Sequence, residues 1–379
     1  MRSLGGAGHT VMVCSSARRP LAGASRFCSV SHLVEDPFRD AGAFRASVER
    51  VVDEQGIELL LPMTDTSAPL LLPLREARPR LVIPFPERSI YEAISDKGHL
   101  MNVARQVGVP VPRQVVVAGP GQAPILEELN AGPLVLKPAR SAVVRDEGMR
   151  KFGVRLVASH VELGEGLGRF PPEAYPILVQ ERIVGPGLGA FMLTREGRPV
   201  ATFAHRRIRE KPPTGGVSVY RESVPLRSDV GRHAERILEA FRWTGVAMVE
   251  FKEDAATGTP YLMEVNGRFW GSLQLAIDAG VDFPALLVRM ALGEDVGAAP
   301  AARLGIRSRW LWGDVDHLLW MLVSSGAMRA ANPELPGRLG ALARFLIPWR
   351  RGDRFEVLRA GDPGPFVRES IEWFARLGR

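Results

Sequence analysis

Short apolar runs alternate with stretches of helical spacing over the first part of the chain. The apolar run at residues 57–63 predicts a buried strand, and the spacing over residues 39–54 predicts the helix before it. Further strands are expected at residues 10–14 and 81–85. Strands that alternate with helices indicate a small, mostly parallel sheet covered on both faces. The chain shows no strand before its first helical residues, so either the opening strand is missing and Met1 is not the natural start, or the sheet begins one strand late.

The middle of the chain, from about residue 112 to 275, is rich in strand patterns and predicts an α+β module. A helix is expected from a cap at Ser95 or Asp96 to Gly108. Residues 141–151 are polar, mixed in charge and without strong periodicity, which predicts a mobile loop. Strands are expected in PLVLKPA, PILVQERIV, FMLT, PVATFAHRR, GVAMVEF and YLMEV.

The runs GVAMVEF and YLMEV are joined by a turn of Asp, Ala, Thr and Gly, which predicts a hairpin. Strand side chains alternate in direction, so pairing can bring Glu250 and Glu264 together on one face, where Glu264 also meets Leu262. With the amide of Asn266 they form the oxygen-only ligand set that Mg²⁺ prefers. Arg268 adds a planar charged fork that suits a phosphate or carboxylate. The alternative is a hairpin whose polar ends are merely solvated.

Lysine is rare in this arginine-rich chain, which suggests that each retained lysine needs an ammonium group. Lys137 ends an apolar strand and is a candidate for phosphate binding, although a surface lysine is the alternative. Lys97 lies at a helix start, where backbone N–H groups favour anions. The strand end ILVQERIV, with Glu181 and Ile183, offers the apolar walls and backbone groups that an adenine ring needs.

Residues 204–223 place prolines and glycines after a run of cations, which predicts a rigid loop that displays positive charge. Such charges suit an anionic substrate or a transferring phosphoryl group. We expect a substrate loop that includes His205, Arg206, Gly215 and Gly216, with Lys211 as a catalytic cation. A solvated charged connector is the alternative.

Composition excludes several classes of function. The 379 residues carry a formal net charge of +7, but the basic residues are scattered among acids, so no nucleic-acid partner is expected. No apolar run is long enough to cross a bilayer and no signal pattern is present, which predicts a cytoplasmic protein without a membrane partner. Cys14 and Cys28 are expected to be free thiols, with a redox pair or metal site as the alternative.

The last segment, residues 303–379, shows helical spacing at 315–324, 337–345 and 367–377, so it is expected to be mainly helical. Its tryptophans are expected to pack on the main body. A cation site or a partner surface is the alternative.

In order and spacing, these motifs resemble the ATP-grasp superfamily over roughly residues 94–293. The matching features are Lys97, the strand lysine Lys137, the hinge QERI and the acidic pair that ends in EVNGR. Residues 1–85 resemble the domain that precedes this fold in carbamoyl-phosphate synthetase large subunits and related carboxylate-amine ligases. The implied fold class is mixed α/β and α+β. It comprises a parallel α/β domain at residues 1–88 that lacks its first strand, a two-lobed ATP-grasp domain at 89–298 and a helical segment at 303–379.

The resemblance also implies roles for individual residues. Lys97 and Lys137 would contact ATP phosphates, and Glu181 and Ile183 would meet adenine largely through backbone atoms. Arg268 would steady the transferred phosphoryl group or an acyl phosphate. The metal ligands would be Glu250, Glu264 and Asn266, which would hold one or two Mg²⁺ ions, with Mn²⁺ as a substitute.

The sequence departs from the family at two places. The phosphate-covering loop is poor in glycine, so its closure is expected to rely on Arg150 and Lys151. The region after the hinge reads GPGLG, where many members carry an acidic residue for the ribose.

The leading hypothesis is an ATP- and Mg²⁺-dependent ligase that activates a small-molecule carboxylate as an acyl phosphate for attack by an amine or thiol. Such chemistry needs alignment and charge neutralisation more than proton transfer. The alternatives are a carboxylase-type or kinase-type ATP-grasp enzyme and a catalytically silent ATP-binding module. A homodimer is compatible with each of them.

Overall fold

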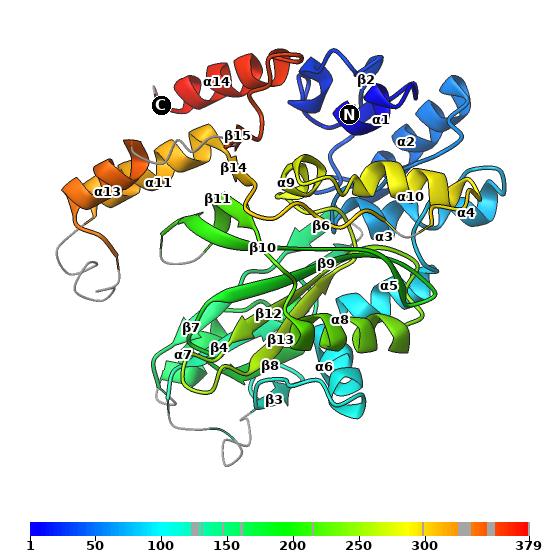
Figure 1. Cartoon of the computed structure of the whole chain (residues 1–379). Coiled ribbons are helices and arrows are strands. Elements are labelled where there is room, and N and C mark those ends of the chain that lie inside the picture. The colour runs from blue at the N-terminus through cyan, green and yellow to red at the C-terminus, as the bar shows by residue number, and fades with distance from the viewer. Residues whose placement is uncertain are drawn as a thin grey trace.

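The computed structural model describes residues 1–122, 129, 132–145, 148–159, 162–213, 216–297, 299–324, 335–346 and 353–377. Within these residues, a large sheet runs through the centre of the molecule (Figure 1). Its strands, in spatial order, are β13 (Pro260–Asn266), β12 (Gly245–Glu253), β9 (Gly187–Arg195), β10 (Arg198–Lys211), β11 (Val217–Ser223), β14 (Arg307–Arg309) and β15 (Arg354–Phe355). All neighbours are antiparallel except β14 and β15, which are parallel.

A smaller antiparallel sheet lies beside the large one. Its strands, in spatial order, are β3 (Gln114–Val117), β8 (Ile177–Glu181), β4 (Leu134–Pro138) and β7 (Arg155–Val157). The helix α7 (Leu163–Gly168) and the 3₁₀ helix at Pro172–Ala174 contribute to its core, which includes Leu136, Ile177 and Val179. The predicted strands at 133–139 and 176–184 are thus present, and the second ends at Glu181.

The segment at 141–151, predicted to be a mobile loop, is instead an antiparallel hairpin of β5 (Ala142–Arg145) and β6 (Gly148–Lys151). Met149 explains the difference, because its side chain is buried in the main core and its backbone N–H donates to the Pro37 carbonyl at 2.9 Å. Lys151 lies over the ring of Phe38, 5.5 Å from its centroid. The N-terminal part of the chain therefore fixes a hairpin whose own sequence lacks a strand pattern.

The N-terminal part contains a parallel pair, β1 (Met12–Ser15) and β2 (Val30–Leu33). The strands expected at 57–63 and 81–85 shrink to one parallel bridge between Leu59 and Val82, because prolines in both segments cannot donate to a ladder. The helices here are α1 (Arg2–Gly6), the 3₁₀ helix Ala22–Ala24, α2 (Ala41–Gln55), α3 (Ser67–Leu71), α4 (Leu74–Ala77), α5 (Arg88–Ser95) and α6 (Lys97–Gln106).

Both faces of the large sheet are covered. On one face, Ala247, Val249 and Phe251 of β12 pack with the N-terminal helices and with α8 (Ser228–Ala240). On the other face, Val246 packs against α9 (Leu273–Asp278) and α10 (Phe283–Ala291). The strand alternation that buries Ala247, Val249 and Phe251 leaves Glu250 on the second face.

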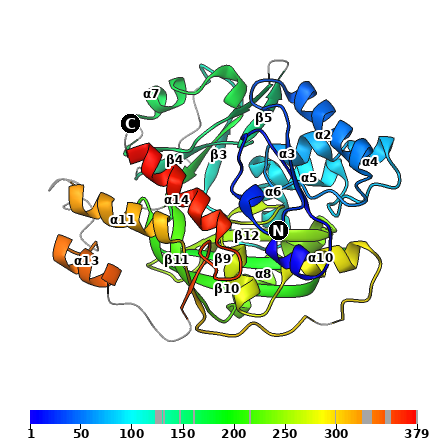
Figure 2. The ribbon, with the colours of Figure 1, turned by 90° about the horizontal axis from the view of Figure 1, so that it is seen from above.

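The C-terminal segment forms the helices α11 (Leu311–Val323), α13 (Arg338–Leu346) and α14 (Gly364–Leu377), and it also adds β14 and β15 to the large sheet. In Figures 1 and 2, α14 lies beside the N-terminal part, and buried Asp362 just before it accepts a hydrogen bond from Arg2 at 2.7 Å. Trp312 stacks on Trp373 with ring centroids 4.3 Å apart. No helix within the described ranges is long and apolar enough to cross a membrane.

Candidate functional site

Glu250 and Glu264 lie directly opposite each other in the β12–β13 ladder, and Asn266 lies opposite Met248. The amide of Asn266 donates to Glu264 Oε1 at 3.1 Å, so the three predicted metal-binding side chains form one group. The ladder shifts register between Glu250 and Phe251, because β13 inserts the extra residue Met263.

The same shift corrects one sequence expectation. Strict alternation would place Leu262 on the face of Glu264, but Leu262 pairs with Phe251 and is fully buried in the main core. Without the bulge, either Glu264 or Leu262 would point to the wrong face of the sheet.

Two lysines approach the acidic pair. Lys97 opens α6, whose N-terminus is capped by Asp96, and its Nζ lies 3.7 Å from Glu264 Oε2 and donates to Ser141 Oγ at 2.6 Å. Lys137 on β4 places its Nζ 3.7 Å from the sulfur of Met263, and burial lowers the pKa of its ammonium group to about 8. The structure therefore gathers both predicted phosphate-binding lysines beside the predicted metal ligands.

The electrostatics of the pair fit a divalent cation. Burial, together with the neighbouring Glu264 carboxylate, raises the pKa of Glu250 to about 7. A cation between the two carboxylates would relieve this repulsion, and two carboxylates with an amide oxygen form the hard donor set that suits Mg²⁺. No cluster of three or more His, Cys, Asp or Glu side chains that could hold a metal occurs in the described ranges, so this candidate set depends on its amide.

Arg268 is held by a residue that the sequence did not identify as part of the site. Its Nε and Nη2 donate to the two carboxylate oxygens of Asp65 at 2.7 and 2.8 Å, although the residues are 203 positions apart. Nη2 also donates to Asn266 Oδ1 at 3.2 Å. The one local signal at Asp65 is a polar TDTS segment that directly follows the apolar run at 57–63.

The prediction of a substrate loop is wrong for much of this segment. Residues 198–211 form one long strand, β10, that pairs with β9 and β11. His205 is buried against Phe191, its Nε2 lies 2.8 Å from Ser272 Oγ, and burial lowers its pKa well below the usual value. It therefore stays neutral and displays no charge. Gly215 lies outside the described residues, while Gly216 packs closely on the backbone of Lys211.

The positively charged side chains of β10 have partners in different parts of the structure. Arg206 pairs with Glu222, and Lys211 pairs with Asp316 of α11. Arg207 donates through Nη1 to Glu210 Oε1 at 2.9 Å and places its Nη2 3.6 Å from Glu250 Oε1. Arg207 is therefore the β10 cation beside the acidic pair, whereas Lys211, the expected catalytic cation, pairs with Asp316.

The comparisons with known proteins agree with this geometry. A family model described as "ATP-grasp in the biosynthetic pathway with Ter operon" matches residues 173–313, which include the acidic pair and Arg268. The L-amino acid ligase from Bacillus licheniformis superposes with a TM-score of 0.59 at 19% identity, over 77% of this chain and 70% of that one. The chain has an ATP-grasp fold. The predicted resemblance and the mixed fold class are thus confirmed.

Two further structures share this ATP-grasp fold. N5-carboxyaminoimidazole ribonucleotide synthetase from Thermus thermophilus has a TM-score of 0.58 at 19% identity, with 80% of this chain and 78% of that chain covered. The biotin carboxylase domain of the Hydrogenobacter thermophilus 2-oxoglutarate carboxylase, in complex with MgADP, ADP and bicarbonate, has a TM-score of 0.60 at 15% identity, with 81% and 69% covered. No curated protein sequence matches the chain.

The hinge expected in an ATP-grasp domain lies at the end of β8. Glu181 is its last residue, and Ile183 follows in an irregular segment. The backbone N–H of Glu181 donates to the Arg113 carbonyl at 3.0 Å. Any backbone donor to adenine from this hinge would therefore come from a residue beyond Glu181.

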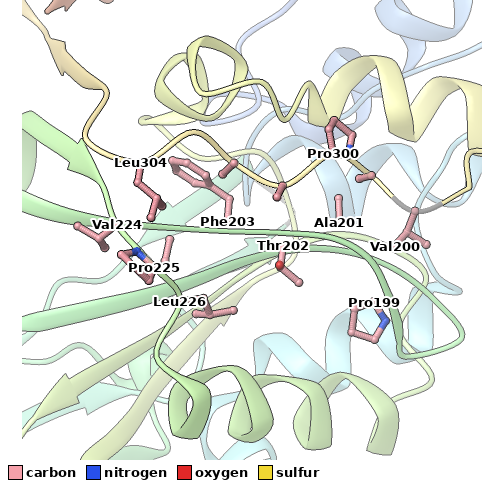
Figure 3. A pocket seen from close by; sticks show the side chains of 14 residues that line it. Pro199, Val200, Ala201, Thr202, Phe203, Val224, Pro225, Leu226, Pro300 and Leu304 are labelled. Carbon is pink, nitrogen blue, oxygen red and sulfur yellow. The ribbon is translucent and has the colours of Figure 1, made fainter. Parts of the chain in front are cut away.

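A separate cavity of about 400 Å³, lined mainly by apolar side chains, lies between β10 and the connection after α10 (Figure 3). It is lined by residues 199–204, 224–226, 299–302 and 304. None of the predicted ATP-grasp site residues lines it, and Thr202 supplies its one side-chain hydroxyl. We therefore do not assign the nucleotide to this cavity.

Proposed function

We propose that this chain is an ATP- and Mg²⁺-dependent ligase that activates a carboxylate as an acyl phosphate and transfers the acyl group to an amine or thiol. The observation that carries the proposal is the opposed pair Glu250 and Glu264 with Lys97 and Lys137 beside it. Opposed carboxylates suit a metal, and nearby ammonium groups suit phosphates, so one small region offers both halves of a metal–nucleotide site.

In this proposal, Glu250, Glu264 and Asn266 hold the Mg²⁺, which supplies charge stabilisation to the transferring phosphoryl group when bound. Lys97 and Lys137 neutralise phosphate oxygens. Burial supports this role for Lys137, because a buried ammonium group interacts more strongly with an anion than an exposed one does. The hinge around Glu181 and Ile183 receives the adenine.

The cations near the acidic pair would complete the site. Arg268, just after β13, and Arg207, on β10, are the two arginines that most strongly lower the pKa of Glu250. We assign Arg268 to the transferred phosphoryl group or the acyl phosphate. We assign Arg207, in place of Lys211, as the second cation, because Arg207 lies 3.6 Å from Glu250 whereas Lys211 pairs with Asp316 of α11.

The division into residues 1–88, 89–298 and 303–379 belongs to the same proposal. Asp65 of the first part contacts Arg268 of the second, and Asp316 of the third contacts Lys211. Substrate specificity would then be set where residues 1–88 and 303–379 contact residues 89–298. A C–N bond is the favoured product, because two similar folds belong to an L-amino acid ligase and to N5-carboxyaminoimidazole ribonucleotide synthetase.

The test is a screen for ADP release. Purified protein is incubated with Mg²⁺, ATP and mixtures of amino acids and dipeptides, and the products are identified by mass spectrometry. The proposal predicts Mg²⁺-dependent ADP release together with a condensed product. Tight ATP binding without ADP release for any acid–amine pair would favour the silent ATP-binding module.

A further inference from the structure

The segment that carries Asp65 is fixed by its own side chains. Thr64 Oγ1 accepts from the Ser67 backbone N–H at 3.0 Å, and the Thr64 N–H donates to Ser67 Oγ at the same distance. Thr64 and Thr66 hydroxyls lie 2.8 Å apart, and Thr66 is buried. These reciprocal bonds hold the turn before α3, so the Asp65 carboxylate projects from a rigid support.

Arg268 uses most of its donors on the protein. A guanidinium group has five N–H donors, one on Nε and two on each Nη. Asp65 takes Nε and one N–H of Nη2, Asn266 takes the other N–H of Nη2, and the Phe269 carbonyl accepts from Nη1 at 3.0 Å. Within the described contacts, one N–H on Nη1 is left for a ligand.

This arrangement restricts what Arg268 does in the proposed reaction. An arginine with a free fork binds a phosphate through two parallel hydrogen bonds and can follow it as it moves. Arg268 instead donates to protein acceptors through Nε, Nη1 and Nη2, so the orientation of its guanidinium group is fixed before any ligand binds. A charged donor that is already in place before the reaction stabilises developing charge with little cost of reorganisation.

We propose that Asp65 is a positioning residue, which fixes the Arg268 guanidinium so that it meets the transferred phosphoryl group through Nη1 alone. The proposal rests on the proposed function, since it takes Arg268 as the residue that meets this group. The competing explanation is that Asp65 and Arg268 form an ordinary ion pair that only attaches the N-terminal part to the central one.

The chain offers a control for the loss of a two-bond ion pair as such. Arg78 donates to both carboxylate oxygens of Asp53 at 2.9 and 2.7 Å, so this pair has the same two-bond geometry as the Arg268–Asp65 pair. It lies within the N-terminal part, and neither residue contacts the candidate site. Asp53→Asn therefore removes an ion pair of the same two-bond geometry without touching Arg268.

The experiment compares melting temperatures of the wild type, Asp65→Asn and Asp53→Asn. Each protein is measured alone, with MgADP, and with MgADP plus fluoroaluminate, which mimics a transferring phosphoryl group. We expect all three proteins to gain the same stabilisation from MgADP. Fluoroaluminate should add further stabilisation in the wild type and D53N, and in D65N its apparent affinity should fall by about tenfold to a hundredfold, as for other residues that orient a ligand-binding group.

The outcomes separate the inference from the proposed function. If MgADP does not stabilise the wild type, the proposed function fails. If MgADP binds but fluoroaluminate adds nothing in the wild type, or adds as much in D65N as in D53N, the positioning role is overturned and the ligase proposal stands. Asp65→Glu provides the same comparison if D65N does not fold, because its longer carboxylate keeps the charge but displaces the guanidinium. Retention of the full fluoroaluminate effect in D65E would likewise overturn the positioning role.

Discussion

Asp314 holds the C-terminal segment to the large sheet, and its replacement by asparagine is expected to destabilise the protein strongly. Asp314 lies on α11 with a fully buried side chain. Its carboxylate accepts from Arg209 Nε and Nη2 at 2.5 and 2.6 Å, and also from Arg309 Nε. One carboxylate thus accepts hydrogen bonds from arginines on two strands, β10 and β14. The Asp314→Asn substitution would remove the negative charge that Arg209 and Arg309 share.

The magnitude follows from how little water reaches the two arginines. The side chains of Arg209 and Arg309 are only 10% and 7% exposed. Removal of one partner from a buried ion pair typically costs about 3–5 kcal/mol, because the other charge stays buried. Some contacts persist, since Arg209 lies over the Tyr220 ring and Arg309 over the Phe345 ring. We therefore expect D314N to lower the free energy of unfolding by about 3–5 kcal/mol, not by twice that amount.

Urea denaturation followed by tryptophan fluorescence measures this loss. The signal is suitable because Trp310 and Trp312 lie next to Asp314 in sequence. The control is Glu196→Gln, which breaks a pair with Arg242 in which both side chains are more than half exposed. The control should change stability by less than about 1 kcal/mol. If D314N behaves like the control, the ion-pair network does not hold the C-terminal segment, and the argument from burial is wrong.

The remaining predictions concern the candidate site and the β5–β6 hairpin. Glu264→Gln should lower Mg²⁺-dependent ADP release by about a hundredfold or more, because it removes the charge of one proposed metal ligand; an unchanged Mg²⁺ titration would count against the site. Lys137→Met should weaken ATP binding in calorimetry by about tenfold, the loss of one charged hydrogen bond. Gly148→Ala should lower the melting temperature, since the added Cβ would lie 2.6 Å from the Phe38 carbonyl oxygen at a φ of 111°, whereas Gly153→Ala meets nothing within 4 Å and should not.

The acidic hairpin was predictable from local sequence, because alternation along two short strands allows pairing to bring Glu250 and Glu264 to one face. The bulge at Met263 was not predictable from local sequence, because it depends on how Leu262 packs in a core that distant helices complete. Lys97 and Lys137 were identified by their places at a helix start and a strand end. That both reach the same carboxylates is a result of tertiary packing.

Two errors have the same physical origin. The strand expected at 199–207 is present, but residues 208–211, which are rich in charge, and 141–151, which lack apolar periodicity, were interpreted as loops. In the structure, β10 is held between β9 and β11, and the β5–β6 hairpin is held by Met149 and the Pro37 carbonyl. Long-range pairing thus overrides local composition, and the same limit hid the contact between Asp65 and Arg268.

The central claim is that a carboxylate attacks ATP to form an acyl phosphate, and isotope transfer tests it most directly. The acid found by the ADP-release screen is labelled with ¹⁸O in its carboxylate and incubated with the enzyme, Mg²⁺, ATP and the amine. Attack of a carboxylate oxygen on the γ-phosphorus, followed by displacement of phosphate by the amine, predicts one ¹⁸O atom in each phosphate released. Phosphate without the label, formed together with the condensed product, would contradict the account.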